Sequence, residues 1–285
     1  MFEGFTAATI DTGEAMIRVR YAGSGPPLLL LHGHPQTHVM WHQVAPRLTQ
    51  DFTVVVADLR GYGESSKPAT TADHEPYSKR AMARDQVAVM RELGFDRFSV
   101  AGHDRGGRVA YRLALDHPDR VAKLAVLDIV PTGEALRRAD ADFALGYWHW
   151  FFLAQPAPFP ERLIGHDPDA FYFQGDRSFF HPEALAAYLR SVEDPATVHA
   201  MCEDYRAAAT IDFALDESDR GTRRIACPVL VLWAGRGQLP GWYDVLAIWR
   251  DWAADVRGRA IASGHYLAEE APDETCAELH AFFTG

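Results

Sequence analysis

The sequence predicts an α/β fold, with a mostly parallel central sheet that is flanked by helices and carries a helical insertion. Three observations support this prediction. Short apolar runs alternate with stretches of helical spacing, as in chains whose helices link parallel strands. Between residues 133 and 222 no such run occurs, and aromatic residues and prolines are frequent instead. The alternation then returns. We therefore expect a core of residues 1–132 and 223–285 and a helical cap of residues 133–222.

The strands of the core are expected where the short apolar runs occur. The run at residues 27–31 reads PLLLL, which is typical of a strand buried on both faces of a parallel sheet. The residues expected to form strands are 15–21, 27–31, 52–57, 98–101, 121–127, 225–232 and 259–261. Helical spacing predicts helices at 77–93, 109–115, 242–252 and 272–283. Such sheets bind ligands at the carboxyl ends of their strands, so functional residues are sought there.

The chain has 285 residues, of which 48% are hydrophobic, enough for one well-buried domain with an insertion. Its formal charge of -11 argues against a nucleic-acid or anionic membrane surface as partner. The N-terminal residues have neither a basic segment nor a long apolar stretch, so a cytoplasmic location is expected. Three widely spaced cysteines indicate neither a disulfide framework nor a metal site, and no motif implies a metal or an organic cofactor.

The most informative stretch is Gly102-His103-Asp104-Arg105-Gly106, which lies between the expected strand at 98–101 and a helix. A strand, a sharp turn and a helix in this order are typical of a nucleophile elbow, whose central residue has a strained backbone. Glycines are needed two positions to either side, because a side chain there would clash with the neighbouring elements. The central residue is Asp104 rather than Ser or Cys.

A carboxylate at this position predicts displacement at a saturated carbon. Attack on a carbonyl group would give only a mixed anhydride, whereas attack on an sp³ carbon with a leaving group gives an ester that water can cleave. The second step needs a base. His265 is expected to be that base, because it lies in the loop between the last strand and the last helix. Asp128, at the end of the strand that follows the elbow helix, is expected to orient the imidazole.

Backbone and arginine donors around the nucleophile are expected to hold negative charge. The turn after the strand at 27–31 places the N–H of His34 where an oxyanion would lie, and the N–H of Arg105 is a second donor. Arg105 and Arg108 lie three residues apart on one helical face. Their planar guanidinium groups match the two oxygens of a carboxylate and could hold an anionic substrate despite the acidic chain. The alternative is that both arginines form structural salt bridges.

Together these residues resemble the α/β-hydrolase superfamily and, within it, the fluoroacetate (haloacetate) dehalogenases. The motifs that carry the resemblance extend over nearly the whole chain, at residues 32–37, 102–108, 127–132, 147–150 and 264–265. The most specific feature is the Asp-Arg-Gly-Gly-Arg elbow in combination with the acid at Asp128.

The resemblance implies a short 2-haloacid as substrate and a role for each residue. Asp104 would displace the halide, and Arg105 with Arg108 would bind the substrate carboxylate. His265, oriented by Asp128, would direct water onto the aspartyl ester to give the 2-hydroxy acid. The resemblance implies a homodimer, and it implies no metal or organic cofactor.

The halide would be bound from the cap, where the resemblance assigns this role to His149 and Trp150. Two positions depart from the family pattern. His34 replaces an aromatic residue, which is expected to alter the pocket or its pH response. Thr210 is aligned with a cap tyrosine that supplies a third halide donor. Loss of that donor weakens the case for fluoride release more than for chloride or bromide release.

Two alternatives remain open. An epoxide hydrolase shares the aspartate nucleophile and needs two cap tyrosines, for which Tyr147, Tyr172, Tyr188 and Tyr205 are available. A neutral epoxide, however, leaves the paired arginines without an evident task. The other alternative is a hydrolase-fold protein that binds a small acid without turnover, against which the intact nucleophile, base and acid argue.

Overall fold

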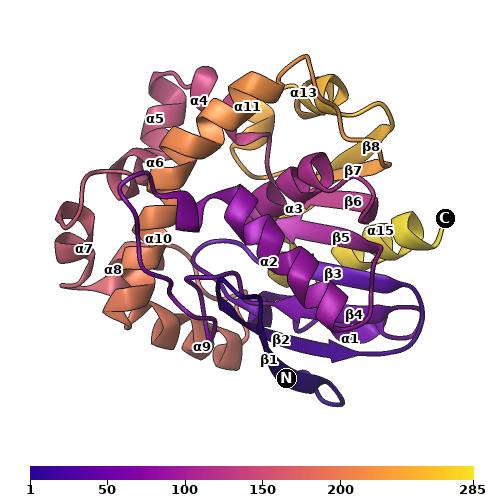
Figure 1. Ribbon diagram of the computed structural model, residues 1–285. Coiled ribbons are helices and arrows are strands. Elements are labelled where there is room, and N and C mark those ends of the chain that lie inside the picture. Colours follow the sequence, from indigo (N-terminus) through magenta and orange to yellow (C-terminus); the bar gives the residue numbers. More distant parts are fainter.

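The computed structural model describes residues 1–285 and contains one 8-stranded sheet in the order β1-β2-β4-β3-β5-β6-β7-β8 (Figure 1). The strands are β1 (Thr6–Asp11), β2 (Met16–Ala22), β3 (Pro27–Leu31), β4 (Thr53–Ala57), β5 (Phe98–His103), β6 (Val121–Leu127), β7 (Val229–Ala234) and β8 (Val256–Ile261). β2 runs antiparallel to both of its neighbours, and every other pair of adjacent strands is parallel. The predicted mostly parallel sheet is confirmed.

The predicted strands differ from the observed ones at three places. The strand predicted at 259–261 begins earlier, at Val256. The sequence prediction lacks β1, an edge strand in which only Ile10 is buried, so that its apolar pattern is weak. The strand predicted at 225–232 begins later, at Val229. Pro228 has no N–H for the ladder, and Ile225 makes only an isolated bridge to Ala253.

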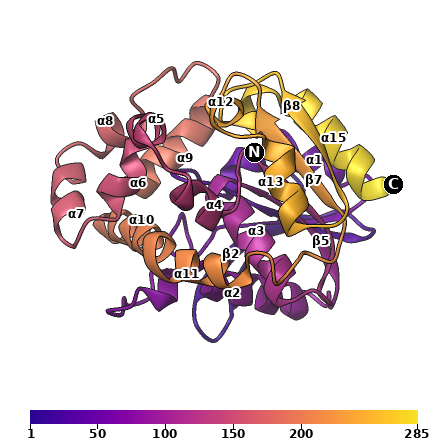
Figure 2. The same cartoon turned by 90° about the horizontal axis from the view of Figure 1, so that it is seen from above.

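Helices cover both faces of the sheet. α2 (Lys79–Glu92) and α3 (Asp104–Asp116) pack together on one face, and α1 (Ala45–Leu48) and α15 (Pro272–Thr284) lie together on the other (Figure 2). The start of α2 is set by Ser78, whose hydroxyl accepts a hydrogen bond from the N–H of Ala81. Shorter pieces are the 3-10 turns η1 (His38–Trp41) and η2 (Glu75–Tyr77) and the helix α14 (Leu267–Glu270).

The helix predicted at 242–252 is wrong in its first turn. α12 (Leu239–Trp242) and α13 (Val245–Trp252) are separate helices. They separate because the backbone of Asp244 is extended and its carboxylate caps α13 at the N–H of Ala247.

Only helices occur between β6 and β7. They are α4 (Thr132–Arg137), α5 (Ala141–Gly146), α6 (Trp148–Leu153), α7 (Phe159–Ile164), α8 (Pro168–Tyr172), α9 (Pro182–Val192), α10 (Pro195–Ala207), the π-helical turn η3 (Ala208–Asp212) and α11 (Phe213–Asp219). We call this segment, residues 132–219, the cap. In both ribbon views α6, α7, α8 and α10 lie at the end of the molecule away from the C-terminus.

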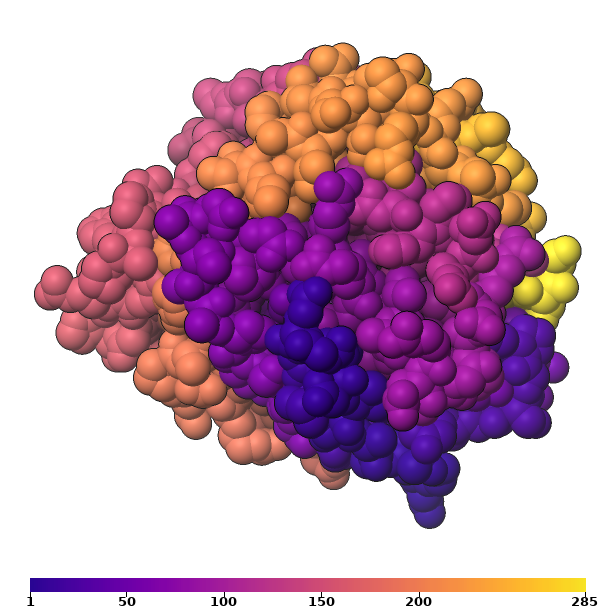
Figure 3. Space-filling view, viewed as in Figure 1, coloured from indigo at the N-terminus to yellow at the C-terminus, as the bar shows by residue number.

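The cap lies directly against the core. In Figure 3 the orange surface of the last cap helices is continuous with the violet and magenta surface of the core. The cap also holds most of the exposed large apolar side chains, which are Leu145, Trp148, Phe151, Phe159 and Leu163. None of the helices is long and apolar enough to span a membrane.

Candidate active site

A cavity of about 400 Å³ lies between the core and the cap. From the core it is lined by the three residues expected to be catalytic, Asp104, Asp128 and His265. From the cap it is lined by aromatic rings, among them Tyr147, His149, Trp150, Tyr172 and Tyr205. Asp104 and Asp128 directly follow the parallel strands β5 and β6, so their shared edge of the sheet brings them together.

The backbone at Asp104 has the strained geometry predicted for a nucleophile elbow. Its φ is 45°, in the left-handed region, and it is the first residue of α3. A Cβ atom on Gly102 would lie 2.3 Å from the carbonyl oxygen of Gly106, and one on Gly106 would lie 2.4 Å from that of His32. Both glycines are therefore required for the tight approach of strand, turn and helix.

Two kinds of group stabilise the Asp104 carboxylate. The N–H of His34 donates to its Oδ1 over 2.9 Å, as the sequence predicts. Burial alone would raise the pKa of Asp104, but the neighbouring imidazoles of His265 and His103 and the two arginines that follow it hold this pKa well below its ordinary value. The carboxylate of Asp104 is therefore ionised. The role of the Arg105 N–H as a second oxyanion donor stays a prediction.

His265 and Asp128 form the expected pair. Nδ1 of His265 lies 2.7 Å from Oδ2 of Asp128, and Oδ1 of Asp128 accepts the N–H of Ala234 over 2.9 Å. Burial disfavours the charged imidazole, but the hydrogen bond and charge of Asp128 outweigh it and raise the pKa of His265 above 6.5. The imidazole is thus held with Nδ1 toward Asp128 and Nε2 available for a proton.

His103 is a supporting residue that the sequence analysis did not single out. Its ring lies 4.6 Å from that of His265, centroid to centroid, and its Nε2 is 2.8 Å from the carbonyl oxygen of His265. Burial lowers its pKa to about 4, so the ring is neutral and donates from Nε2. The position directly before the nucleophile is the sequence signal that could have indicated it.

Arg105 does not line the cavity; it is fully buried behind it. Its Nε and Nη2 donate to the cap residue Asp204, at 3.0 and 2.5 Å, and Nη1 is buried without a partner. The guanidinium carbon lies 4.1 Å from the ring centre of Tyr205, which does line the cavity. Most of the hydrogen-bonding capacity of this arginine is therefore used by the protein, and one end is unused.

Arg108, like Arg105, is buried and does not line the cavity. Its Nη1 donates to the carbonyl oxygen of Val130 and the hydroxyl of Thr132, both at 3.1 Å, and its Nε is buried without a partner. The guanidinium carbon lies 4.4 Å from the ring centre of Trp150. Unpartnered buried N–H groups are costly unless a ligand or water satisfies them. Both arginines thus combine positive charge near Asp104 with unused donors.

The predicted cap residues meet on one wall of the cavity, together with a residue that was assigned differently. The ring of Tyr205 lies 6.0 Å from that of His149 and 6.1 Å from that of Trp150, centroid to centroid. Burial lowers the pKa of His149 to about 4, so this ring is a neutral donor. Thr210 is not at the site: it is exposed, its hydroxyl donates to the carbonyl oxygen of Arg206, and it is the third residue of the π-helical turn η3. Thr210 therefore does not line the cavity, whereas the phenol ring of Tyr205 does.

The imidazole of His34 also faces the cavity. Its ring packs edge-on against Tyr172 at 5.2 Å and Tyr205 at 5.1 Å, and its Nδ1 is buried without a partner. Burial lowers its pKa to about 3, so the ring is neutral. Tyr188, one of the tyrosines considered for epoxide chemistry, is elsewhere, with its hydroxyl 3.0 Å from Glu269. No group of three His, Cys, Asp or Glu side chains is placed to hold a metal ion.

The fold and the site define the class of protein. The chain belongs to the α/β-hydrolase family, whose model for the alpha/beta hydrolase fold matches residues 26–272. It is an enzyme that resembles the haloacetate dehalogenases: it is 48% identical to a fluoroacetate dehalogenase of a Burkholderia sp over 292 aligned residues, 100% of this chain and 95% of that protein.

Two further comparisons agree with this class. A solved α/β-hydrolase structure from Nostoc sp PCC 7120 is 56% identical and superimposes with a TM-score of 0.98, covering 100% of this chain and 99% of that chain. A soluble epoxide hydrolase from a Corynebacterium sp. is 34% identical over 288 residues, 95% of this chain and 96% of that protein.

Proposed function

We propose that the protein is a hydrolytic dehalogenase of short 2-haloacids, of the haloacetate or fluoroacetate type. The observation that carries this proposal is the pair of buried arginines beside an ionised Asp104, each with N–H groups that have no protein partner. A carboxylate on the substrate would satisfy these donors, because guanidinium groups bind carboxylates through charge-assisted hydrogen bonds. The similarity to a fluoroacetate dehalogenase supports the same substrate class.

In the first step Asp104 displaces the halide. Its Oδ1 is engaged by the N–H of His34, so Oδ2 is the attacking atom. A bond forms between Oδ2 and C2 of the haloacid while the carbon–halogen bond breaks, and the halide leaves with the electron pair. His149, Trp150 and Tyr205 bear the N–H and O–H groups that would stabilise the departing anion.

In the second step water cleaves the aspartyl ester. Nε2 of His265 takes a proton from the water, and the hydroxide adds to Cγ of Asp104. Negative charge then develops on Oδ1, to which the N–H of His34 already donates, and this donor stabilises the tetrahedral intermediate. The intermediate collapses as the bond between Cγ and Oδ2 breaks, and the protonated His265 returns its proton to Oδ2, which leaves as the hydroxyl of the 2-hydroxy acid. The water oxygen stays in the carboxylate of Asp104.

The proposal is tested with fluoroacetate, chloroacetate and styrene oxide, using the wild-type protein and Asp104→Asn. We expect halide and glycolate in equal amounts from the wild type and neither from the variant. One turnover in H₂¹⁸O should label Asp104 and leave the first glycolate unlabelled. Diol from styrene oxide without halide from either haloacid would contradict the proposal.

Epoxide hydrolysis is the second candidate. It is supported by the similarity to a soluble epoxide hydrolase and by the cap phenols of Tyr147, Tyr172 and Tyr205, which line the cavity. Two such phenols could protonate an epoxide oxygen. It leaves the unpartnered arginine donors unexplained, so we rank it second.

The cytoplasmic location, the homodimer and the domain limits at 133 and 222 remain proposals as well. The exposed apolar side chains of the cap, such as Leu145 and Phe159, favour a surface that another copy covers. Sedimentation of the purified protein would measure the oligomeric state directly, and a monomer at all concentrations would rule out the dimer.

A further inference from the structure

We propose that Asp204 is a positioning residue, which holds the guanidinium of Arg105 so that Nη1 is the end left free to bind the substrate carboxylate. The inference rests on the proposed function, in which Arg105 binds that carboxylate. It adds a cap residue, far from the elbow in sequence, to the groups on which substrate binding depends.

The contacts between the two residues leave Arg105 a single orientation. Nε donates to Oδ2 of Asp204 at 3.0 Å, and Nη2 donates both to Oδ1 at 2.5 Å and to the backbone carbonyl oxygen at 2.9 Å. Both side chains are fully buried. A guanidinium has five N–H bonds, of which Nε and Nη2 carry three. The remaining two are on Nη1, which is buried and has no partner.

The residue after Asp204 reinforces this arrangement. Tyr205 stacks its ring on the Arg105 guanidinium at 4.1 Å and lines the cavity. Asp204 thus binds one edge of the Arg105 guanidinium, and the next residue of α10, Tyr205, packs on its face. One turn of this cap helix therefore carries both the residue that positions Arg105 and a proposed halide donor.

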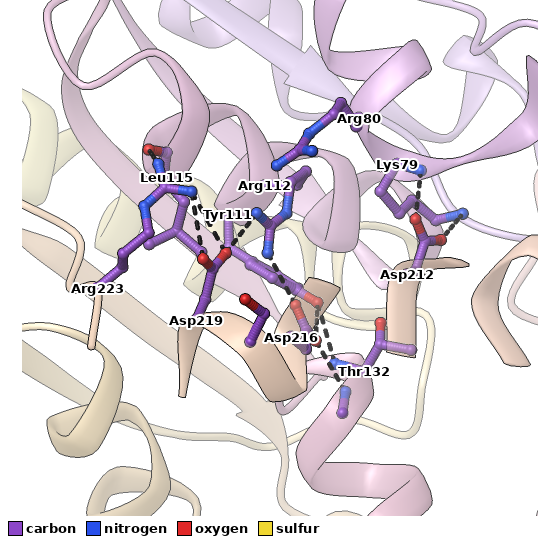
Figure 4. Close-up of polar contacts among 12 residues, drawn as sticks. Lys79, Arg80, Tyr111, Arg112, Leu115, Thr132, Asp212, Asp216, Asp219 and Arg223 are labelled. Carbon is purple, nitrogen blue, oxygen red and sulfur yellow. Dashed lines mark hydrogen bonds and ion pairs between the residues drawn. The ribbon is translucent and has the colours of Figure 1, made fainter. Parts of the chain in front are cut away.

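Asp204 is itself held by further donors. The hydroxyl of Tyr62 donates to its Oδ2 at 2.8 Å, and the ammonium of Lys79 donates to its Oδ1. Burial would raise the pKa of Asp204, but Arg105 and Lys79 hold this pKa well below its ordinary value. Lys79 also lies beside Asp212 (Figure 4), with 3.7 Å between Nζ of Lys79 and Oδ2 of Asp212. The carboxylate is therefore ionised, and its neighbours restrict its own movement.

Positioning and simple charge attraction predict opposite results when the carboxylate is neutralised. Without the charge of Asp204, the arginine and the lysine would attract an anionic substrate more strongly, and affinity would rise. If the main effect of Asp204 is to orient Arg105, affinity falls because the guanidinium can rotate away from the substrate. We infer that orientation dominates, since three of the five N–H bonds depend on Asp204.

The chain contains a matched control on the same helix. Arg112, seven residues after Arg105 on α3, donates to the buried cap residue Asp216 at 3.0 Å, and Tyr111 donates to the same carboxylate at 2.7 Å (Figure 4). Asp216 does not line the cavity and does not contact Arg105 or Arg108. Asp216→Asn therefore perturbs a comparable buried pair between core and cap without touching the proposed carboxylate site.

The test compares Asp204→Asn and Asp216→Asn with the wild type. We measure KM and kcat for chloroacetate, the inhibition constant of acetate, and thermal unfolding. For Asp204→Asn we expect KM and the acetate constant to rise about tenfold, with a smaller change in kcat, since a well-oriented charged hydrogen bond is lost. For Asp216→Asn we expect both constants to stay within about twofold of wild type. Unchanged or lower constants in Asp204→Asn, or equal rises in both variants, would overturn the proposal.

A milder variant covers the case in which Asp204→Asn does not fold. Tyr62→Phe removes one hydroxyl that donates to Asp204 and keeps the ring, and it should raise the acetate constant about two- to threefold. An unchanged constant in a folded Tyr62→Phe protein would count against the proposal. Acetate binding, measured by calorimetry, needs no turnover. If the wild type releases no halide yet binds acetate in an Asp204-dependent way, the proposed reaction fails and the positioning role stands.

Discussion

The imidazole of His265 is bound by the carboxylate of Asp128, which ends the strand next to that of the nucleophile, with 2.7 Å between Nδ1 and Oδ2. Ala234, the last residue of β7, donates its N–H to the other oxygen of Asp128. Asp104 and Asp128 thus follow the adjacent strands β5 and β6, His265 lies in the loop after β8, and all three residues belong to the core.

Replacing Asp128 should greatly lower the rate of the second step, the hydrolysis of the ester. In Asp128→Asn the amide can no longer stabilise a protonated imidazole, and it can hold the ring in the wrong tautomer. We expect kcat to fall on the order of 10³- to 10⁴-fold, as for other triads that lose their acid. Stopped-flow measurement should still detect a burst of halide, because the displacement step does not need His265. Loss of the burst together with turnover would show that Asp128 acts earlier.

Removing the base should trap the ester. In His265→Gln the displacement by Asp104 proceeds and hydrolysis stops, so one halide is released per active site. Mass spectrometry of the intact protein should find an added carboxymethyl group, and peptide mapping should locate it on Asp104. An unmodified protein after incubation with chloroacetate would contradict a covalent mechanism.

The rate of the hydrolytic step should depend on the protonation of His265. The imidazole must be neutral to accept a proton from water, and its pKa is raised above 6.5. We therefore expect kcat to rise with pH through a pKa higher than the ordinary histidine value. The pKa of Asp104 is far lower, so the nucleophile stays ionised over the same range. A kcat that is independent of pH from 5 to 9 would contradict this assignment.

The two cap positions considered as the third halide donor should behave differently. Tyr205→Phe removes the phenol beside His149 and Trp150, and fluoride release should fall more than chloride release because fluoride depends most on hydrogen bonding. We expect a loss of about tenfold or more for fluoroacetate, the worth of one hydrogen bond to a charged group. Thr210→Ala is the matched control and should change neither rate, since Thr210 is exposed. Equal losses in both variants would contradict the assignment of the third halide donor to Tyr205.

A buried carboxyl group should make stability depend on pH. Glu269 accepts hydrogen bonds from Tyr188 of the cap and from Gln36, and burial raises its pKa from 4.5 to about 8. Between these two values the folded protein keeps a proton that the unfolded chain releases. The free energy of unfolding should then decrease as pH rises, by up to about 1.4 kcal/mol per pH unit. Urea unfolding of Glu269→Gln should lack this slope, and an unchanged slope would exclude Glu269 as its source.

The sequence was sufficient to predict the core of the site. Gly102 and Gly106 are required by backbone contacts that any residue with a Cβ would break, so the elbow has a local signal. Asp128 and His265 follow predicted strands and meet at one edge of a parallel sheet, which topology alone requires. The edge strand β1 was missed because only Ile10 of its residues is buried, which leaves little pattern to detect.

The cap was harder to predict for a physical reason. Tyr205 and Thr210 lie in one continuous helical stretch, and nothing in its sequence indicates that η3 is π-helical. Tyr205 lies in α10 and lines the cavity, whereas Thr210 lies in the π-helical turn and is exposed. Arg105 and Asp204 are far apart in sequence, so no local motif predicts that they form an ion pair. His34 is predicted to alter the pocket or its pH response. It lines the cavity, and burial lowers its pKa to about 3, so the ring stays neutral and gives no reason for a pH response.

Helix α3 carries the nucleophile at its first residue and binds cap aspartates through Arg105 and Arg112. Exchange of the cap for one that lacks these aspartates would therefore leave the buried guanidinium of Arg105 without its carboxylate partner, while Arg112 would keep only Asp116 of its own helix. A chimaera with such a cap needs the α3 that matches it. The unit that recombines intact is the cap together with the nucleophile helix, and the remainder of the sheet serves as the common scaffold.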